Sequence, residues 1–107
     1  MKVYWTAQAR TRLVEIQTYI AQDSPQAAHA VVARLLRRAG TLATPPLTGR
    51  RLPEYRDSET DLRELLERPF RIIYRVTGPN QVEVTTVFHF RQRLPHDPKR
   101  VQNTPSD

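Results

Sequence analysis

From Phe70 to Pro95 the sequence reads FRIIYRVTGPNQVEVTTVFHFRQRLP, and this stretch decides the fold. Apolar and polar residues alternate on both sides of Gly78-Pro79-Asn80, which predicts two antiparallel strands joined by a tight turn. Alternation assigns the core face of the two strands to Phe70, Ile72, Tyr74, Val76, Val82, Val84, Thr86, Phe88 and Phe90. It assigns an exposed, half-polar face to Arg71, Ile73, Arg75, Glu83, Thr85, Val87, His89 and Arg91. We therefore expect Arg71 and His89 to share the exposed face.

Two amphipathic helices are predicted before these strands. Thr6 can cap the first, which is expected to end near Gln22, with Arg12 off its apolar stripe of Ala9, Leu13, Ile16 and Ile20. Ser24 can cap the second helix, and Pro25 fits its first position because no N–H is needed there. The apolar stripe of the second helix is Ala28, Val32, Leu35, Ala39 and Leu42, and Pro45-Pro46 is expected to end it.

The remaining segments complete a small α+β fold. Residues 3–5 read as a short strand, residues 45–61 as a surface loop with extended character around Arg51 and Leu52, and residues 62–68 as another strand. The predicted order is β-α-α-β-β-β, with a helical hairpin packed on one face of a small antiparallel-rich sheet and the other face open. Residues 1–95 are expected to form a single domain and residues 96–107 a flexible C-terminal tail.

Composition excludes several classes of protein. The 107 residues contain no cysteine, which excludes disulfide scaffolds and thiol chemistry, and His29, His89 and His96 lack the spacing of a metal site. We therefore expect no metal and no cofactor. No window has the length and apolar character of a membrane helix and the N-terminus does not resemble a signal peptide, so we expect a cytoplasmic protein with no membrane partner. The net charge of +6 favours an acidic protein or a nucleic acid as partner.

Two segments carry a resemblance to a known family. DLRELLERPFRIIYRV, residues 61–76, and VFHFRQRLP, residues 87–95, resemble the RelE/ParE superfamily of toxins from type II toxin–antitoxin modules, and the ParE branch is the closer likeness. The likeness includes the opening VYWTAQARTRLVEIQTYIAQDSP and runs over residues 2–95 in matching element order. The closing motif of the family often reads His-Gly-Arg-Arg-Asp-Leu-Pro. In this chain Phe90 stands in the glycine place, Gln92 in the second arginine place and Arg93 in the acidic place; at the strand entry, Pro69-Phe70-Arg71 replaces Tyr-Arg-Ile.

The resemblance implies a toxin that a cognate antitoxin neutralises by wrapping a segment across the helices and sheet, so that a toxin–antitoxin hetero-oligomer is expected. An acidic antitoxin would also suit the charge of +6. ParE-like members inhibit DNA gyrase without breaking phosphodiester bonds themselves, and this is our leading hypothesis. RelE-like members are endoribonucleases that cleave mRNA on the ribosome, and this is the alternative. A third interpretation is an inactive relative that only binds its antitoxin.

Three residues fit the chemistry of metal-free RNA cleavage. Such cleavage needs a base for the ribose hydroxyl, a cation for the phosphorane charge and an acid for the leaving oxygen. Glu54, Arg71 and His89 supply these residue types, and they resemble the loop glutamate, strand arginine and late-strand histidine of the ribonuclease members. ParE-like toxins carry a similar arginine and histidine without nuclease activity. We therefore favour a docking or structural role for His89 and Arg71, and a surface role for Glu54.

Target binding is assigned to a wider set of cations. Arg91 and Arg93 follow the last strand, where their side chains can reach a partner without burying charge. Arg50 and Arg51 follow Gly49 in the loop and can contact phosphates by the same logic. The predicted target-binding residues are His89, Arg91, Arg93, Arg50, Arg51 and Arg71.

Overall fold

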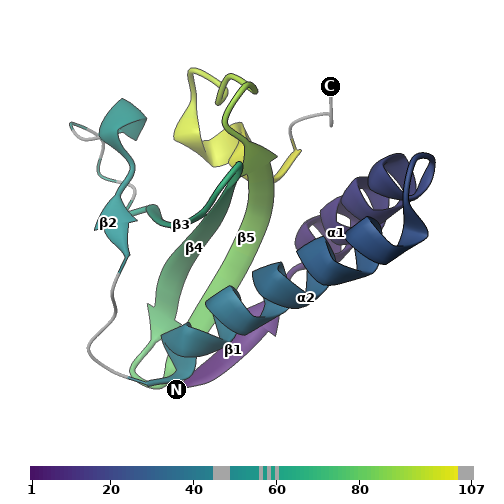
Figure 1. Cartoon of the computed structure of the whole chain (residues 1–107). Coiled ribbons are helices and arrows are strands. Elements are labelled where there is room, and N and C mark those ends of the chain that lie inside the picture. Colours follow the sequence, from purple (N-terminus) through teal and green to yellow (C-terminus); the bar gives the residue numbers. More distant parts are fainter. Residues whose placement is uncertain (45–48, 56, 58, 60, 104–107) are drawn as a thin grey trace.

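The computed structural model describes residues 1–44, 49–55, 57, 59 and 61–103. Two helices lie side by side across one face of a five-stranded sheet, which has the strand order β1-β5-β4-β3-β2 (Figure 1). β1 is parallel to β5, and the other pairs are antiparallel. The elements in chain order are β1 (Lys2–Trp5), α1 (Ala7–Ala21), α2 (Pro25–Gly40), the 3-10 turn η1 (Thr41–Ala43), β2 (Arg50–Arg51), η2 (Pro53–Tyr55), β3 (Arg63–Glu67), β4 (Phe70–Gly78), β5 (Gln81–His89) and η3 (Pro98–Asn103).

Local capping signals explain where the helices begin, as predicted. The Thr6 hydroxyl accepts a hydrogen bond from the Ala9 N–H at 3.0 Å, and the Ser24 hydroxyl does the same for the Ala27 N–H. Pro25 occupies the first position of α2. α2 ends at Gly40, and the prolines expected to stop it at 45 and 46 lie outside the described residues. The predicted α+β class is confirmed, with β2 as an additional edge strand where extended character was expected.

The main core lies between the helical hairpin and the sheet. It is built from alternate strand residues and from the inward positions of both helices. Its buried members are Ala9, Leu35, Ala39, Leu42, Leu65, Phe70, Ile72, Tyr74, Val82, Val84 and Val87. Gly49 lies close against this layer: a Cβ at that position would stand 2.1 Å from the Tyr74 hydroxyl, so no other residue fits without movement.

The second face of the sheet is not open along its whole length, which corrects the prediction of one-sided coverage. A smaller core forms there, and its members are Leu52, Tyr55, Leu62, Ile73, Phe88, Val101 and the half-buried Leu94. The C-terminal segment was expected to be a flexible tail, but residues 98–103 form η3 and Val101 is only 1% exposed. This segment lies at the end of β5 (Figure 1). Isolated Val101 in a proline-rich stretch gave no periodic signal of this packing.

A β-bulge in β5 changes which residues face the helices. Ile73 pairs with Thr86 and Tyr74 with Val84, so Thr85 is an extra residue. Val87 consequently joins the main core and Phe88 the smaller one, the reverse of the predicted alternation. The prediction was right as far as Val84 and wrong beyond it, because one inserted residue moves all later side chains to the opposite face.

None of the helices in the described part of the chain has both the length and the apolar character needed to cross a membrane.

Candidate functional site

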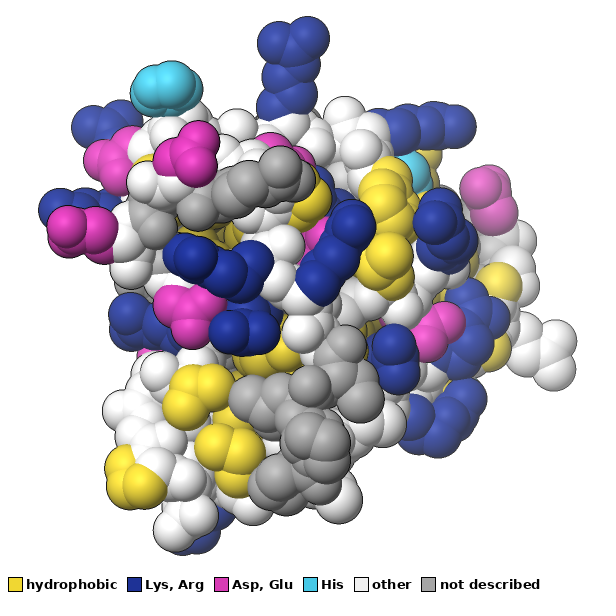
Figure 2. Space-filling view, turned by 90° about the vertical axis from the view of Figure 1, so that its left-hand side faces the viewer, with side chains coloured by type: hydrophobic (Ala, Val, Ile, Leu, Met, Phe, Trp, Pro, Cys, Tyr) yellow, Lys and Arg dark blue, Asp and Glu magenta, His cyan; other side chains and the backbone are white. Residues whose placement is uncertain are grey.

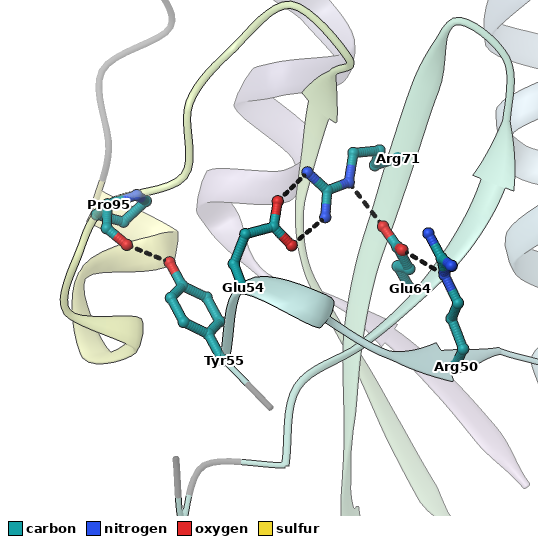
Figure 3. A network of polar contacts seen from close by, with 6 residues as sticks. All are labelled: Arg50, Glu54, Tyr55, Glu64, Arg71 and Pro95. Atoms are coloured by element: carbon teal, nitrogen blue, oxygen red, sulfur yellow. Dashed lines mark hydrogen bonds and ion pairs between the residues drawn. The ribbon is translucent and has the colours of Figure 1, made fainter. Parts of the chain in front are cut away.

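A polar network on the second face joins two arginines and two glutamates from four segments of the chain (Figure 3). Arg71 Nη1 and Nη2 donate to the two carboxylate oxygens of Glu54 at 2.7 and 2.8 Å, and Arg71 Nε donates to Glu64 Oε1 at 2.6 Å. Arg50 Nε donates to the other oxygen of Glu64 at 2.8 Å. The formal charges of these four side chains cancel, so the network is neutral as a unit.

Sheet register brings this network together. Arg71 on β4 pairs with Leu66 of β3, and Glu64 stands two residues away on the same face, within reach of a long side chain. Glu64 in turn pairs with Arg50 of β2. Glu54 comes from η2, the turn that follows β2. β2 and the turn that follows it therefore place Arg50 next to Glu64 and Glu54 next to Arg71.

Burial makes the network electrostatically strong. The side chain of Arg71 is 8% exposed and that of Glu64 is fully buried. Hydrogen bonding to Arg71 lowers the pKa of Glu54 below its ordinary value despite partial desolvation. Burial opposes the charge of Arg71, but the hydrogen bonds from Glu54 and Glu64 outweigh it and raise its pKa. Both Glu54 and Arg71 are therefore held in their charged forms.

The same loop is tied to the C-terminal segment. Tyr55, next to Glu54, donates its hydroxyl proton to the carbonyl oxygen of Pro95 (Figure 3). Burial, with a smaller contribution from the nearby charge of Glu54, raises the pKa of Tyr55 to about 12. This bond holds the η2 turn against the segment that follows β5.

His89 lies away from this network, on the helix side of the sheet. It pairs with Phe70 in the β4–β5 ladder, and the two rings meet edge to face at a centroid distance of 5.5 Å. The His89 Nδ1 atom accepts a hydrogen bond from the Arg91 N–H at 3.0 Å, which places the proton of the neutral ring on Nε2. The expectation that Arg71 and His89 share a face is therefore wrong.

The predicted ribonuclease trio is thus only partly assembled. Glu54 and Arg71 are in direct contact, whereas His89 faces the helices. A phosphate group approaching Arg71 would meet a guanidinium already bonded to two carboxylates, and the ionised Glu54 is a weak base because its pKa is lowered. This arrangement is suited to fastening a loop to the sheet.

The predicted target-binding cations are distributed over three places. Arg71 and Arg50 belong to the network, and Arg51 forms an ion pair with Asp61 at 3.3 Å. Arg91 and Arg93 are exposed beyond the end of β5. Figure 2 views the molecule from the β2 side, where Lys and Arg side chains are interspersed with acidic ones. The β2 side is therefore a surface of mixed charge rather than a continuous basic patch.

An aromatic side chain accompanies the exposed cations after β5. Phe90 is 39% exposed, and the guanidinium of Arg68 lies over its ring at 5.0 Å. Sequence alternation placed Phe90 in the core and missed this pair. We call Arg68, Phe90, Arg91 and Arg93 the strand-end cluster, because Arg68 precedes the start of β4 and the other three follow the end of β5, where Phe70 pairs with His89.

A groove of about 670 Å³ lies beside the strand-end cluster, between α1, the start of β4 and the end of β5. Its walls are largely apolar, and its polar members are Arg12, Glu15, His89, Arg91 and Gln92. Tyr19 on its α1 wall is 73% exposed. A large exposed aromatic residue beside an apolar groove is typical of a protein-binding surface.

Arg12 was expected off the apolar stripe of α1, yet it is buried. Its spacing contained the signal, because Arg12 is three residues after Ala9 and four before Ile16, both of which face the core side. The charge of the residue concealed this position.

Fold and site together define a small α+β protein with a helical hairpin on one face of its sheet and an apolar groove beside exposed cations. Residues 3–94 match the family model described as ParE toxin of type II toxin-antitoxin system, parDE, and the chain belongs to this family. It is the toxin component of such a module. The chain is 39% identical over 94 residues to the toxin candidate Y4kP of Sinorhizobium fredii, covering 88% of this chain and 93% of that protein. It is also similar to a chain in the solved structure of the chromosomal ParDE TA system from P. aeruginosa, with a TM-score of 0.66 and 27% identity over 83% of this chain and 95% of that one.

Proposed function

We propose that this toxin inhibits DNA gyrase by binding it, without cutting a phosphodiester bond itself. One observation supports the proposal above all: the three residues that RNA cleavage requires are divided between two faces of the sheet. Glu54 and Arg71 neutralise each other on the second face, and His89 packs against Phe70 on the helix side. The candidate general acid, His89, is therefore not positioned beside the arginine.

The strand-end cluster is the surface that we assign to the target. Arg91 and Arg93 are exposed, and the stacked pair of Arg68 and Phe90 adds a partly exposed aromatic face. Guanidinium groups bind carboxylates and phosphates in a bidentate manner, so the cluster suits an acidic protein surface or the DNA held by an enzyme.

The test uses purified toxin, gyrase and supercoiled plasmid, scored for loss of supercoiling and for trapped DNA cleavage. We expect Arg91→Glu to raise the concentration for half-inhibition by about tenfold, because an attractive contact becomes repulsive. Arg37→Glu is the matched control, since it makes the same charge change at an exposed position of α2 outside the cluster. An inactive wild-type toxin would exclude gyrase as the target, and equal effects of the two variants would exclude the cluster as the surface.

The groove beside α1 is the position that we propose for a segment of the antitoxin. The apolar walls fit the apolar side chains of a bound segment, and the charge of +6, with Arg91 on the rim, fits a segment that carries carboxylates. Because Arg91 belongs to both the groove and the strand-end cluster, an antitoxin bound there would cover part of the target surface.

Two residues of α1 provide a matched test of this position. Tyr19 lines the groove and is 73% exposed, whereas Val14 is 60% exposed on the same helix and does not line it. We expect Tyr19→Asp to weaken binding of the cognate antitoxin by about tenfold or more, and Val14→Asp to change it little. Calorimetry with the two purified proteins measures this, and equal losses would exclude the groove.

A further inference from the structure

The second half of β5 has an open edge that other groups must satisfy. β1 pairs with β5 only as far as Trp5 opposite Val84, after which the chain turns into α1. The Thr6 N–H donates to the Val84 carbonyl at 3.1 Å, and the Thr6 hydroxyl donates to the Thr85 carbonyl at 2.8 Å. Arg12 Nε donates to the Val87 carbonyl at 3.0 Å. Arg12 therefore continues, as a side chain, the edge that β1 leaves unpaired.

Arg12 also reaches the turn after β5. Its Nη2 atom donates to Gln92 Oε1 at 2.7 Å, and the same oxygen accepts the backbone N–H of His89 at 2.8 Å. The backbone N–H of Gln92 donates to the carbonyl of His89 at 2.9 Å. One amide oxygen thus joins α1, the end of β5 and the turn that carries Arg91.

The guanidinium of Arg12 is costly to bury. Apart from these hydrogen bonds, it lies 5.8 Å from the centroid of the Phe88 ring, and this cation–π contact offsets part of the cost. Arg12 is 5% exposed, and its acidic neighbour Glu15 is 3.5 Å away with a partly exposed side chain. An uncharged residue would fill the same space without desolvating a charge. What a neutral residue could not supply is a set of forked donors that reach two elements at once.

We propose that Arg12 and Gln92 are a positioning pair that holds the turn of residues 89–92 in the conformation that binds the target. The inference rests on the proposed function for its biological meaning, because the turn carries Arg91 of the strand-end cluster. Neither Arg12 nor Gln92 needs to touch the target. They act by fixing His89 and Arg91, whose own contact, from the Arg91 N–H to His89 Nδ1, depends on the same turn.

The pair also explains why glutamine suits position 92. Gln92 Oε1 accepts from Arg12 and from His89 at the same time, and an arginine there would offer only donors. Two guanidiniums would then face each other, and the His89 N–H would lose its acceptor. Gln92→Arg is therefore expected to release the turn, although it adds a cation beside the proposed target surface.

Three variants test the positioning pair. Gln92→Met keeps the length of the side chain but removes the acceptor oxygen, Gln92→Glu keeps the acceptor, and Gln92→Arg replaces it by donors. We expect the amide proton of His89 to exchange about tenfold faster in the Met and Arg variants, equivalent to ~1.4 kcal/mol, and near the wild-type rate in the Glu variant. The concentration for half-inhibition of gyrase is expected to follow the same order. Arg10→Met is the control on α1, because Arg10 is exposed and its side chain donates to the Trp5 carbonyl at 2.7 Å rather than to the turn after β5.

The outcomes separate the positioning pair from the proposed function. Unchanged exchange at His89 in Gln92→Met would overturn the pair, whatever gyrase does. Faster exchange at His89 with unchanged inhibition by an active toxin would also overturn it, because the turn would then have no bearing on the target. A wild-type toxin without effect on gyrase contradicts only the proposed target. In that case the exchange rates and their rescue by Gln92→Glu still decide whether the pair holds the turn.

Discussion

Arg71 and His89 stand one residue pair apart in the β4–β5 ladder, yet their side chains lie on opposite faces of the sheet. Arg71 pairs with Phe88, and His89 pairs with Phe70. The bulge at Thr85 creates this separation, because without the extra residue both side chains would point the same way. Arg71 consequently meets two carboxylates in a closed network, and His89 joins the groove beside α1.

Arg71→Ala is expected to destabilise the protein by about 3–5 kcal/mol. The reason is Glu64, which is fully buried and would lose its buried partner and keep the exposed Arg50. Urea unfolding followed by fluorescence of Trp5 measures the change. Arg50→Ala is the control, because Arg50 bonds to the same carboxylate but is 63% exposed, and its loss is expected to cost at most about 1 kcal/mol. Similar losses in the two variants would contradict this account of the network.

Glu54→Gln is expected to flatten the acid side of the stability profile. The pKa of Glu54 in the folded protein lies below its ordinary value of 4.5, chiefly through its hydrogen bonds with Arg71. The pair therefore stabilises the fold at pH above 4.5, and this contribution is lost as the pH falls through the folded-state pKa. The free energy of unfolding, measured by urea titration from neutral pH to below pH 4.5, should fall less steeply in Glu54→Gln. A slope equal to that of the wild type would show that other carboxylates carry the acid dependence.

Tyr55→Phe is expected to change the alkaline side of the profile. The pKa of Tyr55 is raised from 10.0 to about 12, so the folded state favours the protonated phenol. This contribution is complete below pH 10, and it is lost as the pH rises from 10 towards 12. Urea unfolding measured below pH 10 and above it should show a smaller alkaline loss of stability in Tyr55→Phe than in the wild type. A full alkaline loss in this variant would assign the effect to another group.

Val101→Ala is expected to lower the free energy of unfolding by about 2 kcal/mol, since it removes buried methyl groups from the second core. Val101 is 1% exposed and packs with Ile73 and Phe88. Lys99→Ala, at an exposed position of the same segment, is the control and should be near neutral. If Val101→Ala were equally neutral, the segment after Pro95 would behave as the flexible tail that its composition predicts.

The features that the sequence predicted are those with local signals. Both helix starts follow from hydroxyl caps at Thr6 and Ser24, and the hairpin follows from alternation around Gly78-Pro79-Asn80. The bulge at Thr85 was missed because Thr85-Thr86 resembles any strand interior. The burial of Arg12 was missed because its charge concealed a position that the spacing places near the core, and because its partners Val87 and Gln92 are far away in sequence. The pairing of Arg71 with particular carboxylates likewise depends on the register between strands, and the sequence of a single strand does not encode that register.

The last prediction concerns the alternative activity, cleavage of mRNA on the ribosome. We expect primer extension on translated mRNA to show no new cuts with the wild-type toxin, because its base and phosphate clamp neutralise each other and its acid lies on the other face. Arg71→Ala is an ambiguous probe, because it also lowers the stability of the fold by removing a charged partner from the buried Glu64. His89→Ala is cleaner, because the described contacts of the half-buried ring are local: it accepts from the Arg91 N–H and packs on Phe70. Cuts made by the wild type and lost in His89→Ala would establish a ribonuclease, and would require the turn after β5 to carry His89 around the strand edge towards Arg71 when the ribosome is bound.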